Sequence, residues 1–117
     1  MLYDPKWEEK INYVAPWRTV LLRAAEIVRE RGLAKHRLED DFGHVCIHGA
    51  IRIAACGHSN GSGGIGPKEI ESCQALCDYL RQTGVENVYG YGAAEWNNEP
   101  SRTADEVIAA LEGAARS

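Results

Sequence analysis

Apolar residues recur every three to four positions along most of the chain, which is the spacing of amphipathic helices. The clearest such segment runs from Trp17 to Arg31, with charged residues on its opposite side. Its apolar stripe consists of Val20, Leu21, Ala24, Ala25, Ile27 and Val28. Gly32 predicts the end of this helix, because glycine adopts the left-handed conformation of a C-terminal cap at little cost.

A shorter helix is predicted ahead of this one. Asp4-Pro5 has the residue types of a helix N-cap followed by the first helical position. Trp7 and Ile11 lie four residues apart and would share one face. The Ala15-Pro16 step predicts the end of this short helix.

A second long helix is predicted from His44 to Ala55, after a polar connection over Ala34–Asp41. Its apolar arc is wide, which indicates a central position: Cys46, Ala50, Ile53 and Ala54 lie along one side, with Ile47 and Ile51 beside them. Gly49 weakens a helix by about 1 kcal/mol relative to alanine. We therefore expect another helix to cross close to Gly49.

Residues 56–66 include five glycines and lack the Lys-Ser/Thr ending of a phosphate-binding loop. They predict a mobile surface loop. Pro67 then opens a third helix, which Gly84 ends. Its apolar positions are Ile70, Cys73, Leu76, Cys77 and Leu80.

Residues 85–100 have the composition of a loop, with a short strand at Val85–Tyr89 as an alternative that lacks an obvious partner. Thr103 and Glu106 form a capping box, which predicts the start of a last helix. Its apolar stripe is Val107, Ile108, Leu111, Ala114 and Ala115. The pattern predicts an all-α fold: a compact four-helix bundle-like single domain over residues 1–117, with an additional short N-terminal helix.

Length and charge reduce the number of function classes that fit this chain. A chain of 117 residues is about the length of one domain. Its net charge of −4 argues against binding nucleic acid through bulk charge. The charge is uneven, at +2 over residues 1–68 and −6 over residues 69–117. The acidic half is either a differently solvated face or a surface for a basic partner.

Three features that the sequence lacks indicate the cellular compartment in which we expect this protein. No apolar run approaches the roughly 20 residues that span a bilayer. The first thirty residues lack the layout of a signal peptide. The four cysteines have no regular spacing that indicates a disulfide framework. We therefore expect a cytoplasmic protein with reduced thiols.

Three segments together carry a resemblance to a known family. They are Leu22–Glu26 with Gly32, then Val45–Ile51 with Ala54-Ala55, then Trp96–Asn98 with Pro100, Arg102-Thr103 and Glu106-Val107. In this order the chain resembles a family of small bacterial and bacteriophage proteins known only as a domain of unknown function. The resemblance covers roughly residues 17–115 and supports a helical fold. Asn98 stands where that family's pattern has Asp, and no activity carries over from the resemblance.

Imidazoles and thiols give the first candidate site. His44 and His48 are four residues apart, a spacing at which two imidazoles on a helix can bind one metal ion, with His58 as a further candidate ligand. Arg52 continues the same stripe and would repel a cation. Cys46 near the helix start is a candidate thiol nucleophile with His48, although two helical residues so spaced point about 200° apart. A metal- or thiol-dependent site on His44, Cys46 and His48, with Cys56 or His58, is therefore an alternative.

Aromatic residues give the second candidate site. Tyr89, Tyr91 and Trp96 lie in a glycine-containing segment, followed by Asn97 and Asn98. Tyr and Trp are enriched at binding hot spots. These five residues are the predicted partner-binding site. Trp96 could instead close one end of the bundle, with an asparagine bonding the turn.

No set of residues provides a nucleophile, a base and a charge stabiliser together, so binding is favoured over catalysis. We expect a small cytoplasmic interaction protein with a macromolecular partner, most readily another protein, and no cofactor. The resemblance adds a phage-related modulator of a host factor as one form of this role. A small-molecule pocket between the helices near Trp96 is a further alternative.

Overall fold

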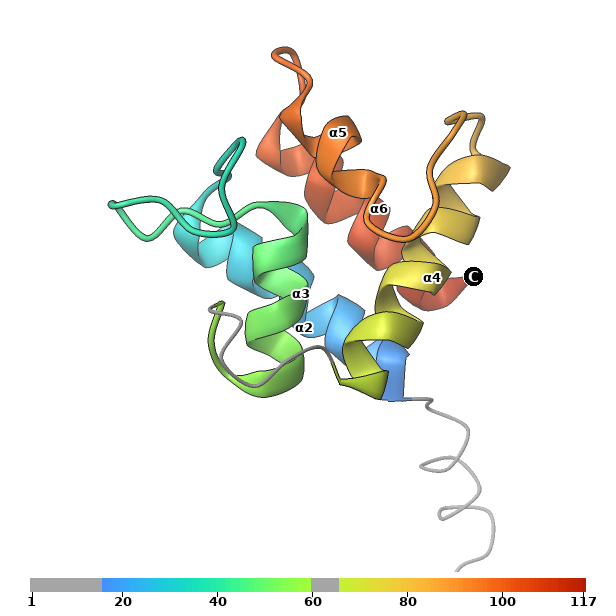
Figure 1. The fold of residues 1–117 in the computed structure, drawn as a ribbon, viewed down its shortest axis with the longest axis horizontal. Helices are drawn as coiled ribbons and strands as arrows, with labels where there is room; N and C mark the ends of the chain where they lie inside the picture. Colours follow the sequence, from blue (N-terminus) through green and yellow to red (C-terminus); the bar gives the residue numbers. More distant parts are fainter. Residues whose placement is uncertain (1–15, 60–65) are drawn as a thin grey trace, which may run out of the picture.

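The structure is a computed structural model that describes residues 16–59 and 66–117. In these ranges the chain forms five α-helices and no strand, which confirms the predicted all-α class (Figure 1). They are α2 (Pro16–Arg31), α3 (Ile47–Cys56), α4 (Pro67–Gln82), α5 (Ala93–Asn98) and α6 (Ala104–Arg116). None of these helices is long and apolar enough to cross a membrane. The short helix predicted at residues 4–14 falls outside the described part of the chain.

Helix α2 forms the centre of the core and packs against α6, α3 and α4. All six residues of its predicted stripe are buried. Helix α6 begins at the predicted capping box, in which Thr103 and Glu106 bond each other's backbone N–H groups. Its predicted stripe is also buried, together with Ala110. The sequence pattern is therefore confirmed for this central pair of helices.

Helix α4 begins at Pro67 as predicted, but Glu69 and not Ile70 is the buried residue of its first turn. Ile70, predicted in the stripe, is 45% exposed, whereas the neighbouring Glu69 is buried. Cys73 and Cys77 further along are buried as expected. Glu69 lies at the same helical spacing as Cys73 and Leu76, and inside the molecule its carboxylate pairs with Arg52 of α3.

The prediction that a helix begins at His44 is wrong, because α3 begins at Ile47. Val45 instead forms isolated β-bridges, and its backbone bonds the backbone of Gly32 and Ala34. A buried side chain, Asn97, accepts a hydrogen bond from the Ile47 backbone N–H at 2.9 Å. This contact from 50 residues away satisfies one of the donors that a helix start leaves open.

Gly49 does lie at a close approach, but not against a helix. A Cβ on this residue would stand 1.9 Å from the backbone oxygen of Leu38. The expected helix crossing is therefore wrong. The segment between α2 and α3 packs its backbone on the first turn of α3, where only glycine leaves room.

The segment predicted as loop over residues 85–100 contains a helix, α5, of six residues. No strand forms at Val85–Tyr89. Helix α5 packs on α3, near the segment that joins α2 to α3 (Figure 1). Of the predicted glycine-rich loop, Cys56 ends α3, Gly57 caps it in the left-handed conformation, and residues 60–65 fall outside the described ranges.

Candidate functional site

A pocket of about 510 Å³ lies between residues 36–38, α3, Tyr91 and α5. Its lining is mixed. The polar lining residues are His36, Arg37, Cys46, His48, Arg52 and Asn98, and the others are Leu38, Tyr91 and Ala94. The volume is in the range of pockets that hold small organic ligands.

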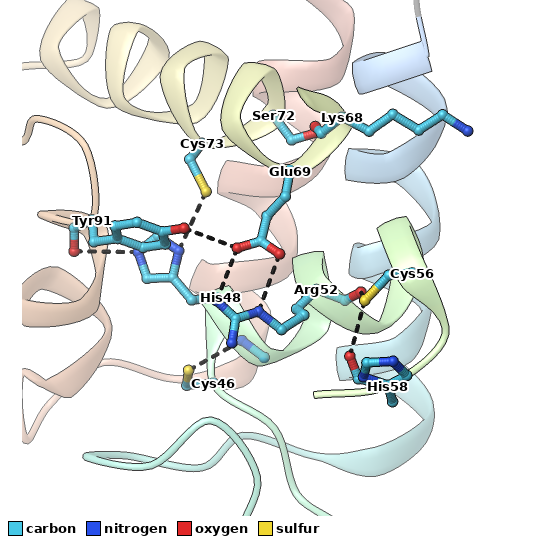
Figure 2. Close-up of polar contacts among 11 residues, drawn as sticks. Cys46, His48, Arg52, Cys56, His58, Lys68, Glu69, Ser72, Cys73 and Tyr91 are labelled. Atoms are coloured by element: carbon cyan, nitrogen blue, oxygen red, sulfur yellow. Dashed lines mark hydrogen bonds and ion pairs between the residues drawn. The ribbon is translucent and has the colours of Figure 1, made fainter. Parts of the chain in front are cut away.

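Arg52 stands in a buried polar network that forms one wall of this pocket. Its Nε and Nη2 each donate to one oxygen of Glu69 at 3.1 Å, which is a bidentate ion pair. The Tyr91 hydroxyl donates to the same carboxylate at 2.9 Å. Figure 2 shows Glu69 between these two partners. The side chains of Arg52 and Glu69 are only 12% and 3% exposed, so the pair holds its geometry away from water.

His48 lies beside this network and is buried. Its Nε2 donates to the Tyr91 backbone carbonyl at 3.2 Å, because a carbonyl oxygen can only accept. Nδ1 then carries no proton and faces the Cys73 thiol, which lies 3.5 Å away (Figure 2). Burial lowers the pKa of His48 to about 4, so the imidazole is neutral at pH 7.

Cys46 occupies the N-cap of α3, where its sulfur accepts a hydrogen bond from the Gly49 backbone N–H at 3.3 Å. A helix N-terminus favours a thiolate. Burial has the larger effect, however, and raises the pKa of this thiol, with the backbone N–H of Gly49 acting against it. Cys46 is therefore a neutral thiol in the pocket wall, capable of donating a weak hydrogen bond.

The structure divides the five residues of the predicted partner site. Tyr91 and Asn98 line the pocket. Trp96 packs against the core, with the Arg102 guanidinium 4.0 Å from its ring centre. Asn97 is fully buried and joins α3 to Ala34, whose carbonyl accepts from its amide at 3.0 Å. Tyr89 is 67% exposed and lies beside Arg81, away from the pocket.

The predicted histidine and cysteine ligands do not converge. His44 pairs with Asp40 through Nδ1 at 2.8 Å, while His48 bonds Tyr91 and Cys73. Cys56 is exposed at the end of α3, and its thiol donates a hydrogen bond to the backbone oxygen of His58. Cys46 and His48 do line the same pocket, because Cys46 precedes the helix. Among the described residues, no three His, Cys, Asp or Glu side chains are grouped so as to bind a metal ion.

Two central residues of this site, Arg52 and Glu69, were absent from the predicted site. The sequence does contain a signal for Arg52. It is the single Asp, Glu, Lys or Arg residue between Asp41 and Lys68, and apolar residues surround it. A charge in such a segment needs a buried partner. No local pattern identifies Glu69 as that partner, because it lies 17 residues further along the chain.

The fold and the site together define a small all-α domain with a pocket beside a buried arginine–glutamate pair. The chain belongs to a family of unknown function, DUF6197, whose model matches residues 13–117. This confirms the resemblance to a family of unknown function. Comparison with curated proteins found no match, and comparison with solved structures found none either.

Proposed function

We propose that this protein binds a small organic molecule in the pocket between α3, α5 and residues 36–38. One observation carries the proposal: the pocket wall is built from polar groups that other residues hold in place. Glu69 fixes Arg52, the Tyr91 carbonyl fixes His48, and the backbone N–H of His36 bonds Asn98 Oδ1 at 2.7 Å. Polar groups that are held in place before a ligand arrives, next to apolar wall residues, are typical of ligand sites.

The test is a fragment screen read by two-dimensional NMR, with a variant that fills the pocket. Ala94 lines the pocket, so Ala94→Phe should occupy it. Ala109→Phe adds the same side chain on an exposed face of α6 and is the matched control. We expect fragments to shift resonances of Tyr91 and Asn98 in the native protein and in Ala109→Phe, but not in Ala94→Phe. Binding that survives in Ala94→Phe, or a diverse library without a single pocket binder, would refute the proposal.

A second candidate function is the binding of a protein partner in the cytoplasm, a host protein if the chain acts in a bacteriophage. Two aromatic side chains outside the pocket favour it, Phe42 at 85% exposure and Tyr89 at 67%. Large exposed aromatic residues are common anchors of protein interfaces. Affinity capture with the native protein, Tyr89→Ala and Ala94→Phe separates the two functions. A protein partner that is anchored at Tyr89 should be lost with Tyr89→Ala and kept with Ala94→Phe, and the reverse result would count against it.

A further inference from the structure

Two residues of the pocket wall, Arg52 and Asn98, have hydrogen-bond donors beyond those that their protein partners engage. An arginine has five N–H groups, and the Glu69 carboxylate engages only Nε and Nη2 of Arg52. Nη1 therefore remains for the pocket that this side chain lines. The Glu69 carboxylate lies on the α4 side of the guanidinium and does not line the pocket (Figure 2).

Asn98 also offers a hydrogen-bond donor to the pocket. Its Oδ1 already accepts from the backbone N–H of His36 at 2.7 Å and from the Asn97 amide at 3.3 Å. Its own NH₂ group is therefore the part left to bond a ligand.

Two acceptors elsewhere in the wall are already engaged. The sulfur of Cys46 accepts from Gly49, and Nδ1 of His48 faces the Cys73 thiol. No Asp or Glu side chain lines the pocket, whereas Arg37 adds a second cationic group. A wall with two guanidinium groups and an amide donor, and with no carboxylate, favours a ligand group that is rich in acceptors and negatively charged.

We infer that the pocket binds the carboxylate or phosphate group of a small organic ligand, with Arg52 as its anchor and Asn98 as a second donor. This inference rests on the proposed function and names its ligand class. The apolar part of the ligand would lie against Leu38, Ala94 and the ring of Tyr91. Glu69 keeps the buried Arg52 charge paired and holds the guanidinium in one orientation.

Matched aromatic probes test the inference. Benzoate and phenyl phosphate carry the two anionic groups, while benzamide is a neutral molecule of similar shape to benzoate. Titration at pH 7, read by NMR on the native chain, should show at least one anion binding about 10-fold or more tightly than benzamide, because a hydrogen bond to a charged group exceeds a neutral one by that order. The stronger of the two anions identifies the source of the charge. Equal affinities for all three probes, or the absence of binding by both anions, would overturn the inference.

Three variants locate the anion. Asn98→Asp keeps the accepting oxygen for His36 but replaces the donor with a carboxylate, so anion affinity should fall about 10-fold or more. Glu69→Gln removes the charge that neutralises Arg52, so anion affinity should rise. The double variant Arg52→Gln/Glu69→Gln loses the guanidinium without leaving an unpaired buried charge. It should bind anions no better than benzamide, and undiminished anion binding here would contradict the assignment of Arg52.

Folding of Glu69→Gln is monitored by its melting temperature. A ligand that binds only the folded state raises this temperature, and the shift grows with the logarithm of its affinity. Benzoate or phenyl phosphate should therefore stabilise Glu69→Gln more than the native chain, even where the variant is partly unfolded. An equal or smaller shift in melting temperature would count against Arg52 as the anchor. If benzamide and the anions bind equally well, the ligand class is wrong but the pocket function stands, whereas a pocket that binds no fragment refutes both.

Discussion

Glu69 satisfies two hydrogen-bonding partners at once, the guanidinium of Arg52 and the hydroxyl of Tyr91. Such a buried pair is weak evidence for stability compared with apolar packing, but removing one partner leaves an uncompensated charge. The network therefore restricts substitution strongly at a position whose helical spacing lies in the buried stripe but whose charge alone would suggest exposure to solvent. Burial of the Tyr91 hydroxyl, followed by its bond to Glu69, raises the pKa of Tyr91 to about 12, so this partner remains a donor at neutral pH.

The first prediction concerns the loss of the Glu69 carboxylate. Glu69→Ala should destabilise the fold by about 3–5 kcal/mol, because the Arg52 charge then remains buried without a partner. Urea unfolding followed by circular dichroism measures this loss. The control is Glu26→Ala, which breaks an exposed pair with Arg23 and should cost about 1 kcal/mol or less. Equal losses in the two variants would show that the buried pair does not restrict the fold in this way.

The second prediction ranks the four thiols by reactivity. Cys56 is exposed and should react first, and Cys46 should follow through the pocket. Cys73 and Cys77 are buried between helices, and burial raises the pKa of Cys73 to about 12. They should react about 100-fold or more slowly than Cys56, because labelling requires local unfolding.

Iodoacetamide labelling at pH 8, followed by peptide mass spectrometry, gives the order of the four sites. Labelling in urea is the control, and there all four thiols should react. Native labelling of Cys73 at the rate of Cys56 would show that the interface of α3 with α4 opens readily.

At the scale of elements, Asn97 connects three segments that are distant in sequence. Asn97 lies in α5. Its side chain accepts a hydrogen bond from the first N–H of α3 and donates one to the backbone carbonyl of Ala34. A short helix without a side-chain cap of its own is thereby fixed in position. Since Asn98 follows directly, this contact also positions the pocket wall.

The third prediction follows from that connection. Asn97→Ala should destabilise the fold by about 2–4 kcal/mol, because each of two buried backbone groups left without a partner costs about 1–3 kcal/mol. Thr103→Ala removes the exposed cap of α6 and should cost only about 1 kcal/mol. Chemical denaturation compares the two, and hydrogen exchange should show faster exchange at Ile47 in the Asn97 variant alone. Unchanged exchange at Ile47 would mean that the N-terminus of α3 does not depend on Asn97.

Sequence periodicity predicts helices that bury an apolar stripe. It fails where a contact with a residue distant in sequence determines where a helix begins. The stripes of α2 and α6 follow from local spacing, and the capping box at Thr103 fixes where α6 begins. The start of α3 cannot be predicted locally, because its cap comes from Asn97. Helix α5 has six residues and no side-chain cap, so it gives no periodic signal.

The candidate site was predictable in part for the same reason. Tyr91 and Asn98 both belong to the segment that was predicted to bind a partner, and both line the pocket. The pairing of Arg52 with Glu69 required knowledge of how α3 packs on α4. Their placement together depends on tertiary packing, which neither helix specifies alone.

At the scale of the whole molecule, His48 lies where α3, α4 and the segment before α5 meet. Its ring contacts the Tyr91 ring at 4.8 Å between centroids, and its two nitrogens face Cys73 and the Tyr91 carbonyl. A proton on Nδ1 would take away the acceptor that faces the Cys73 thiol and place a charge in a buried position. The stability of the whole fold is therefore coupled to the protonation of this imidazole.

The fourth prediction is an acid dependence of stability. The unfolded chain protonates His48 near its ordinary pKa of 6.5, whereas burial lowers the pKa in the folded state to about 4. The unfolded state then binds more protons between these values, so the stabilisation is complete above pH 6.5 and is lost as the pH falls to 4. The expected loss from this residue is about 3 kcal/mol.

His48→Gln isolates this contribution, because a glutamine amide can donate to the Tyr91 carbonyl and does not titrate. Carboxylates also lose stabilisation in acid, among them Glu106, whose pKa the backbone N–H of Thr103 lowers. They do so equally in both proteins, so the difference between the two stability curves reports His48. Urea unfolding from pH 7.5 to 4 should show the native protein losing about 3 kcal/mol more than the variant. Parallel curves would mean that the imidazole takes up its proton without disturbing the junction of α3 and α4.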